Sequence, residues 1–296
     1  MKTGFAATPG RRTFLTVAGL LVLVCATNGK EPTNAEEAIR LEKKQRSAIS
    51  SQDDQAYRTL VAALPPEEQA WEKTLETNLG GDYFSRYLKR RIVPGWNPLE
   101  SEWGYIRDDP ALPRILIIGD SISRAYTLPL RARLLGKANV HRAPANCGPT
   151  DLGLQKLGIW LSQGSGKWDV VTFNFGIHDR EKSPEHYAAN LEKVVDLLEA
   201  SGARLVWCRT TPFGADGDQS EAVNRVSDAV IARRGIVSAD LHSAILPQRE
   251  EYQNKDHFHF FPEGSRILAA KLAEVVEPLL TPPTSMKSEY ETQQTR

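Results

Sequence analysis

The chain has 296 residues, 41% of them hydrophobic, and its 37 Lys and Arg residues balance its 37 Asp and Glu residues. This balance excludes the strongly basic surface that is typical of proteins binding nucleic acid through its phosphates. The length suits one large globular domain, or one such domain with an appendage.

Residues 1–26 have the features of an export signal peptide. A basic start that includes Arg11 and Arg12 precedes an apolar stretch of about 12 residues that ends at Cys25. That stretch is too short to span a bilayer, which takes about 20 apolar residues. The arginine pair resembles the twin-arginine export motif, although an ordinary secretion signal could also contain two arginines. We therefore expect an exported protein, periplasmic or extracellular, with no membrane span in the mature chain.

The three cysteines admit several roles. Lipidation of Cys25 requires small residues before it, and Val22-Leu23-Val24 does not provide them. Cys147 and Cys208 could form a disulfide in an exported protein. However, Cys208 lies within an apolar run and Cys147 in a loop far earlier, so we favour two free thiols. The spacing of Cys and His residues indicates no metal site.

Residues 27–109 are expected to form a helical N-terminal appendage followed by a connecting loop. From residue 35 to about residue 89 the chain is rich in Glu, Lys, Gln, Ala and Leu, which favour helix. Pro66-Glu67-Glu68 is typical of a helix start, with acids at the positive end of the helix dipole. In the loop, Trp96, Trp103 and Tyr105 could stack on sugar rings or simply pack the loop against the domain.

Residues 110–281 are expected to form an α/β domain. Its five short apolar runs do not alternate, as expected of strands buried on both faces of a parallel sheet. The runs cover residues 114–118, 139–143, 169–175, 204–208 and 236–241. Helical stripes lie between them, and three of these helices are marked by Pro184, Gly235 and Pro262. Repeated βα units predict a parallel sheet covered by helices on both faces. The polar tail, residues 282–296, is expected to be disordered.

Polar groups follow several of these predicted strands directly. Ser121, Gly148, the segment 176–178 and Thr210-Thr211 all come just after strand ends. In an open parallel sheet the site lies outside the carboxyl ends of the strands. These groups should therefore meet at one rim of the sheet.

A serine nucleophile and its partners are the most informative feature of the chain. The run that starts at Ile115 ends in Gly119-Asp120-Ser121, which places a serine on a turn after a buried strand. About 135 residues later, Asp256-His257-Phe258-His259 can supply a general base and the carboxylate that orients it. A serine hydroxyl is inert at neutral pH until an imidazole takes its proton. This combination indicates a hydrolase of the acyl-transfer type.

These motifs resemble the sequence blocks of the SGNH (GDSL) hydrolase family over about residues 112–281. The resemblance implies a three-layer flavodoxin-like sandwich with a central parallel five-stranded sheet, and no cofactor. It makes Ser121 the nucleophile, His259 the general base and Asp256 the orienting carboxylate. His257 is a rival base, but it lies two positions too early for the family pattern.

The resemblance also implies an oxyanion hole. Asn146-Cys147-Gly148 matches the second block, so the N–H groups of Gly148 and Ser121 would donate to the oxyanion. The third block, Gly-x-Asn-Asp, is present with His178 in place of the asparagine, which resembles a bacterial variant of the family. Since an imidazole has an N–H in either protonation state, His178 can act as the third donor. The alternative is a structural histidine.

Arg124, just after the nucleophile turn, could bind an anionic group of the substrate such as a carboxylate or sulfate, or could be an ordinary surface arginine. We predict a secreted serine esterase that removes short acyl groups, above all acetyl, from a small-molecule or polysaccharide substrate. A lipid-directed thioesterase or lysophospholipase, or a non-catalytic carbohydrate-binding protein of the same fold, are the alternatives. A nucleotide-binding protein is disfavoured because no Gly-x-Gly-x-x-Gly or Walker loop follows the first strand.

Overall fold

The computed structural model describes residues 49–280. The predicted export signal, the leader that follows it and the predicted tail from residue 282 lie outside these residues. Two units are distinguished along the chain, Met1–Ile39 and Arg40–Arg296, and all described residues belong to the second. Within residues 49–280, none of the helices combines the length and the apolar character needed to cross a bilayer.

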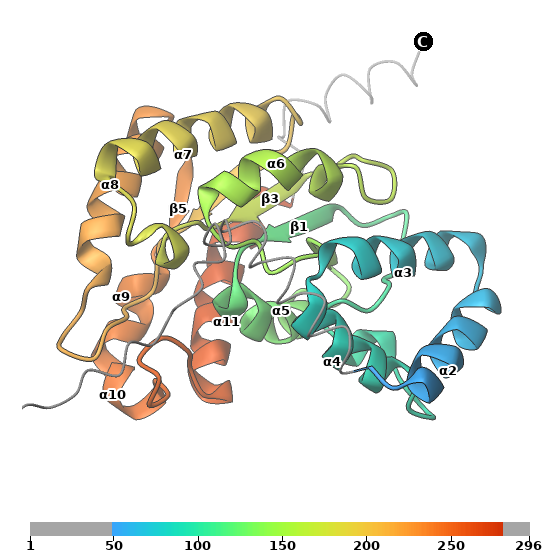
Figure 1. Cartoon of the computed structure of the whole chain (residues 1–296). Coiled ribbons are helices and arrows are strands. Elements are labelled where there is room, and N and C mark those ends of the chain that lie inside the picture. The colour runs from blue at the N-terminus through green and yellow to red at the C-terminus, as the bar shows by residue number, and fades with distance from the viewer. Residues whose placement is uncertain (1–48, 281–296) are drawn as a thin grey trace, which may run out of the picture. The chain divides into compact units, whose positions relative to one another are not determined.

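A five-stranded parallel sheet is the centre of the fold (Figure 1). Its strands are β1 (Arg114–Ile118), β2 (Asn139–Arg142), β3 (Val170–Phe173), β4 (Arg204–Cys208) and β5 (Val237–Ala239). The order is β2-β1-β3-β4-β5, and every neighbouring pair is parallel. The predicted parallel sheet of five strands is therefore confirmed. The prediction of burial on both faces is wrong for β5, where Val237 and Ser238 are exposed because this short strand forms an edge of the sheet.

Helices cover both faces of the sheet, as the repeated βα units predict. On one face lie α5 (Ser121–Arg133), α9 (Leu241–Ile245) and α11 (Pro262–Val276) (Figure 1). On the other lie α6 (Thr150–Leu161), α7 (Pro184–Glu199) and α8 (Ser220–Arg233). Pro184 and Pro262 occupy first helical turns, where the missing N–H of proline costs nothing. The apolar side chains of β1 and β3 are fully buried between these layers, which gives the α/β sandwich.

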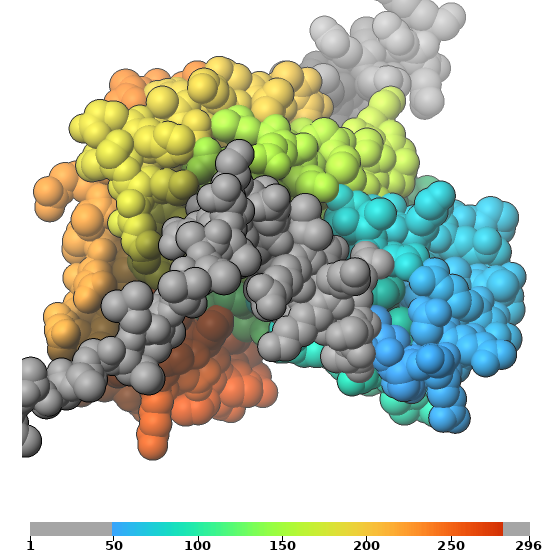
Figure 2. Space-filling view, viewed as in Figure 1, coloured from blue at the N-terminus to red at the C-terminus, as the bar shows by residue number. Residues whose placement is uncertain are grey.

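Three helices precede the sheet, in the part of the chain with a helical composition. They are α2 (Ser51–Ala62), α3 (Pro66–Asn78) and α4 (Gly81–Arg91), which make up one continuous blue and cyan body of atoms in Figure 2. Their apolar side chains form a cluster separate from the main core. The carboxylate of Glu72 is buried inside this cluster, where it accepts hydrogen bonds from the hydroxyls of Tyr57 and Tyr87. A buried ion pair with Arg91 compensates its charge.

The segment between α4 and β1 packs closely onto the sandwich. Trp103 is buried, and its carbonyl accepts a hydrogen bond from the indole N–H of Trp71, 2.8 Å away. Arg131 of α5 donates to the carbonyls of Ser101 and Glu102. For Trp103, burial favours the packing role over the stacking of sugar rings.

Candidate active site

The nucleophile turn is built where β1 meets α5. The Asp120 carboxylate accepts a hydrogen bond from the backbone N–H of Ile122 at 2.9 Å and so caps α5. A Cβ atom at Gly119 would lie only 2.8 Å from Oγ of Ser123, so glycine allows Ser123 to pack beneath the turn. Ser121 is the first residue of α5, at the carboxyl edge of the sheet.

The loop before α11 brings an imidazole to this serine. Nε2 of His259 lies 2.7 Å from Oγ of Ser121. Nδ1 of His259 lies 2.7 Å from a carboxylate oxygen of Asp256, and the other oxygen accepts hydrogen bonds at 2.9 Å from the backbone N–H groups of Phe258 and His259. His257 has a positive φ of 60°, which closes the turn between Asp256 and Phe258. It is therefore His259, and not His257, that contacts Ser121.

The charges of this loop are partly open to solvent. The side chains of His259 and Asp256 are 41% and 48% exposed. Partial burial acts to raise the pKa of Asp256, but the hydrogen bonds from the His259 and Phe258 N–H groups and from the imidazole outweigh it and lower the pKa to about 2. Asp256 is therefore ionised at neutral pH and favours an Nδ1–H tautomer of His259, which leaves Nε2 free to accept a proton.

Gly148 and His178 lie in two loops that are tied together at the same rim. The N–H of Cys147 donates to the Gly119 carbonyl at 3.2 Å, which fastens the first loop to the nucleophile turn. The second loop is a single 3-10 turn, Ile177–Asp179, and Nε2 of His178 lies 3.9 Å from the Asp120 carboxylate. The two loops are thus joined to the same three-residue turn.

Asp179 holds these loops to each other. Its buried carboxylate accepts from the Thr150 hydroxyl at 2.6 Å and from the Thr150 backbone N–H at 3.1 Å. Burial raises the pKa of Asp179, although the Thr150 hydrogen bonds oppose this shift. Asp179 was not predicted as a site residue. Its position in the third family block, directly after His178, was the available signal.

Arg124 already has a partner. Its guanidinium donates to the Glu102 carboxylate at 3.1 Å and lies over the Tyr83 ring, with its side chain 32% exposed. This pairing links α5 to the segment that follows α4. The arginine is therefore not a free cation waiting for a substrate anion.

Cys147 and Cys208 are buried free thiols. Burial raises the pKa of each to about 12. Neither side chain is ionised at neutral pH, so neither can serve as a nucleophile in place of Ser121.

Asp218, Glu221 and His242 bring three potential metal-ligand atoms within 4.8 Å of one another, a grouping that the sequence spacing did not indicate. His242 already contacts the Asp218 carboxylate at 2.6 Å. A guanidinium nitrogen of Arg209 lies 3.8 Å from the Glu221 carboxylate, and another lies 3.4 Å from Nδ1 of His242. A fixed positive charge beside the group fits an ion-pair network better than a cation site.

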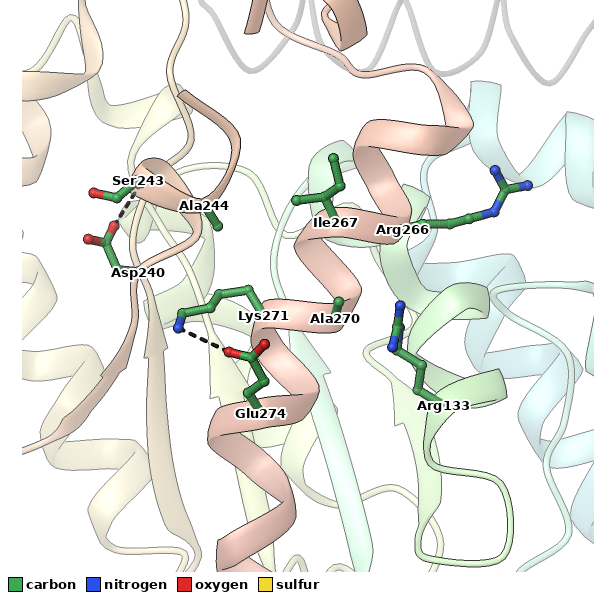
Figure 3. Close-up of a pocket in the computed structure, with 9 residues that line it drawn as sticks. All are labelled: Arg133, Asp240, Ser243, Ala244, Arg266, Ile267, Ala270, Lys271 and Glu274. Carbon is green, nitrogen blue, oxygen red and sulfur yellow. Dashed lines mark hydrogen bonds and ion pairs between the residues drawn. The ribbon is translucent and has the colours of Figure 1, made fainter. Parts of the chain in front are cut away.

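A large surface cavity lies elsewhere, between α5, α9 and α11 (Figure 3). Its volume is about 580 Å³, and its lining includes Arg133, Asp240, Arg266, Lys271 and Glu274. Lys271 and Glu274 pair with each other at 3.1 Å. The mixture of both charges identifies no ligand, and neither Ser121 nor His259 lines this cavity.

Comparisons with known proteins agree with this geometry. The GDSL-like Lipase/Acylhydrolase family model matches residues 117–267, from β1 into α11. Three solved structures are similar to the chain. A protein assigned to the SGNH hydrolases, from Slackia heliotrinireducens, is 26% identical, with 56% of this chain and 99% of that chain covered and a TM-score of 0.46. The acetyl xylan esterase AlAXEase is 16% identical, with 55% and 99% covered and a TM-score of 0.48.

The lipase/acylhydrolase from Enterococcus faecalis is 19% identical, with 58% of this chain and 99% of that chain covered and a TM-score of 0.48. Among curated proteins, no significant match was found. The family match covers both the nucleophile turn and the loop that carries His259. The chain therefore belongs to the GDSL-like lipase/acylhydrolase family, the SGNH hydrolases.

Proposed function

We propose that this hydrolase is an exported serine esterase that removes short acyl groups, above all acetyl, from carbohydrates. The observation that carries the proposal is the line of contacts from Ser121 through His259 to Asp256, each 2.7 Å long. These distances lie within the range for proton transfer between a nucleophile and its base. No cofactor takes part in this chemistry.

In the proposed reaction, Oγ of Ser121 attacks the ester carbonyl while His259 takes the hydroxyl proton. The new Oγ–C bond gives a tetrahedral oxyanion, which accepts hydrogen bonds from the N–H groups of Ser121, Gly148 and His178. The C–O bond to the alcohol then breaks, and His259 returns its proton to the leaving oxygen. Water, deprotonated by His259, attacks the acyl-enzyme and releases the carboxylic acid. Asp256 stays ionised and stabilises the imidazolium.

The choice of a short acyl group on a carbohydrate depends on the exposure of the site. His259 and Asp256 are nearly half exposed, so a bulky polysaccharide can approach them from solvent. Export, predicted from residues 1–26, would bring the enzyme to such polymers. Fractionation of cells that produce the full chain tests export, and replacement of Arg11 and Arg12 by lysine tests the twin-arginine route.

A lipid-directed thioesterase or lysophospholipase is the second candidate. Phe213 and Phe258 stack with ring centroids 5.7 Å apart, and Phe258 immediately precedes His259. This apolar pair beside the catalytic loop could hold a longer acyl chain. Arg180 lies over the other part of this wall, 5.5 Å from the Phe258 ring centre.

Hydrolysis of p-nitrophenyl acetate, butyrate and octanoate, beside Ser121→Ala, tests the proposal. We expect turnover of the short esters that is lost in Ser121→Ala. Faster turnover of octanoate would favour the lipid-directed candidate. If the protein turned over neither these esters nor acetylated polysaccharides, yet bound saccharides equally well with and without Ser121, a non-catalytic binding protein would be the better explanation.

A further inference from the structure

A buried arginine lies directly beneath the nucleophile turn. Arg142 of β2 is 1% exposed. One guanidinium nitrogen donates to Oγ of Ser123 at 2.7 Å, and the other donates to the carbonyls of Gly119 at 2.8 Å and Asp120 at 2.9 Å. All three of these contacts are to residues 119–123.

A charge in this position is costly, and the turn compensates for it. Burial lowers the pKa of Arg142, because the charged form loses its hydration. No carboxylate within residues 49–280 forms an ion pair with it, so the carbonyls and the hydroxyl of the turn carry the compensation. The ring of Trp103 lies 5.8 Å away on another side, and Nε of Arg142 has no hydrogen-bond partner.

Peptide geometry connects this arginine to the proposed oxyanion hole. The carbonyl of Asp120 and the N–H of Ser121 belong to one planar trans peptide, so they point in opposite directions. Arg142 and the Ser123 hydroxyl, 2.7 Å away, both draw the Asp120 carbonyl inward. The Ser121 N–H must then point away from the buried guanidinium.

We propose that Arg142 is a positioning residue, which aims the Ser121 N–H at the oxyanion by holding the Asp120 carbonyl beneath the turn. The role rests on the proposed esterase function. It acts only through the backbone of the turn, because Arg142 does not reach the substrate. Loss of the arginine should therefore weaken the binding of the transition state and leave the binding of the ester almost unchanged.

Arg131 provides a matched control. It also donates to three carbonyls, those of Ser101, Glu102 and Val140, at 2.6, 3.1 and 3.0 Å. None of these belongs to the nucleophile turn. Substitutions of Arg131 and Arg142 both remove an arginine that bridges backbone carbonyls, but only those of Arg142 release the turn.

The experiment compares Arg142→Lys, Arg142→Met, Arg131→Lys and Arg131→Met in the full chain. For each variant, kcat and KM for p-nitrophenyl acetate are measured together with Tm. We expect Arg142→Lys to lower kcat by roughly tenfold and Arg142→Met by more, up to the about 10²–10³ lost with a whole oxyanion donor. KM should stay within about twofold, as for an interaction made only in the transition state. The Arg131 variants should lower Tm but keep kcat within about twofold of the parent.

A folded Arg142→Lys protein with the kcat of the parent would overturn the inference. So would an Arg131 substitution that lowers kcat as much as the matching Arg142 substitution, because the effect would then be general destabilisation. Arg142→Lys keeps the charge and decides the matter if Arg142→Met does not fold. A parent protein without turnover of any ester would instead overturn the proposed function, and the role of Arg142 with it.

Discussion

Nε2 of His178 lies 3.9 Å from the carboxylate of Asp120, the residue immediately before the nucleophile. The imidazole is therefore held at the nucleophile turn, in the position where the family pattern has an asparagine. Both side chains offer an N–H, but the imidazole is larger and changes its charge with pH. This contact suggests that the histidine substitutes for the asparagine as a hydrogen-bond donor.

His178→Ala tests that role. Removal of one oxyanion donor should lower kcat by about 10²–10³, with a small effect on KM. His178→Asn should restore most of the activity, since an amide N–H₂ can donate to the same oxyanion. Steady-state kinetics on p-nitrophenyl acetate would measure both. If the alanine variant were as active as the parent, His178 would be a structural residue.

The two histidines of the last loop can be told apart by substitution. His259→Ala should lose nearly all turnover, because Ser121 then has no base within hydrogen-bond reach. His257→Asn should keep most of it, since asparagine tolerates the positive φ at this position. Thermal melts of both variants serve as the control for folding. Greater loss in the His257 variant would reverse the assignment of the base.

The low pKa of Asp256 predicts how stability depends on pH. Its pKa is about 2 in the folded protein, below the ordinary value of 3.8, so the ionised carboxylate stabilises the fold above about pH 4. That contribution is lost as the pH falls from about 4 through 2. The Tm of Asp256→Asn should therefore lie below that of the parent at pH 7, and the difference should shrink towards pH 2. A difference that stays constant with pH would contradict the prediction.

The positive φ of His257 predicts a stabilising substitution. A residue with a side chain in the left-handed region costs roughly 1–2 kcal/mol compared with the right-handed region, and glycine largely avoids this cost. His257→Gly should keep or raise the free energy of unfolding, by up to about 1 kcal/mol. His257→Val should lower it, because a β-branched residue fits this conformation poorly. Urea unfolding of the two variants measures the difference.

The pairing of Arg124 with Glu102 predicts an effect on stability and none on substrate binding. Arg124→Gln should lower Tm slightly and leave KM for neutral esters unchanged, since the guanidinium is engaged by the carboxylate. Glu102→Gln is the matched variant and should behave alike. A rise in KM for an anionic ester in Arg124→Gln alone would restore the predicted role in binding a substrate anion.

The sequence was a good guide where one local pattern determined the structure. All five strands lie within the predicted apolar runs, because β-branched runs bounded by turns have few other structures available. The helix α5 was harder to recognise, since Pro129 lies in its interior, where proline normally ends a helix. The residues Asp256 and His259 could be predicted because their bond joins positions only three apart in the chain.

Contacts between distant segments could not be predicted in this way. Arg142 interrupts an apolar run, and nothing in its neighbourhood reveals that it reaches the carbonyls of Gly119 and Asp120. The partner of Arg124 is 22 positions earlier, in a loop that has no periodic pattern. Such pairings depend on how β1 and β2 are placed beside each other, which only the folded chain specifies.

The distance between Ser121 and His259 along the chain, 138 residues, has a consequence for folding. The helices that begin beside them, α5 and α11, pack together only after the sheet between them has formed (Figure 1). Contacts between such distant segments form slowly, because the entropy of a long loop must be overcome first. Helical signal should therefore recover early during refolding, whereas catalytic competence should return only when α11 docks.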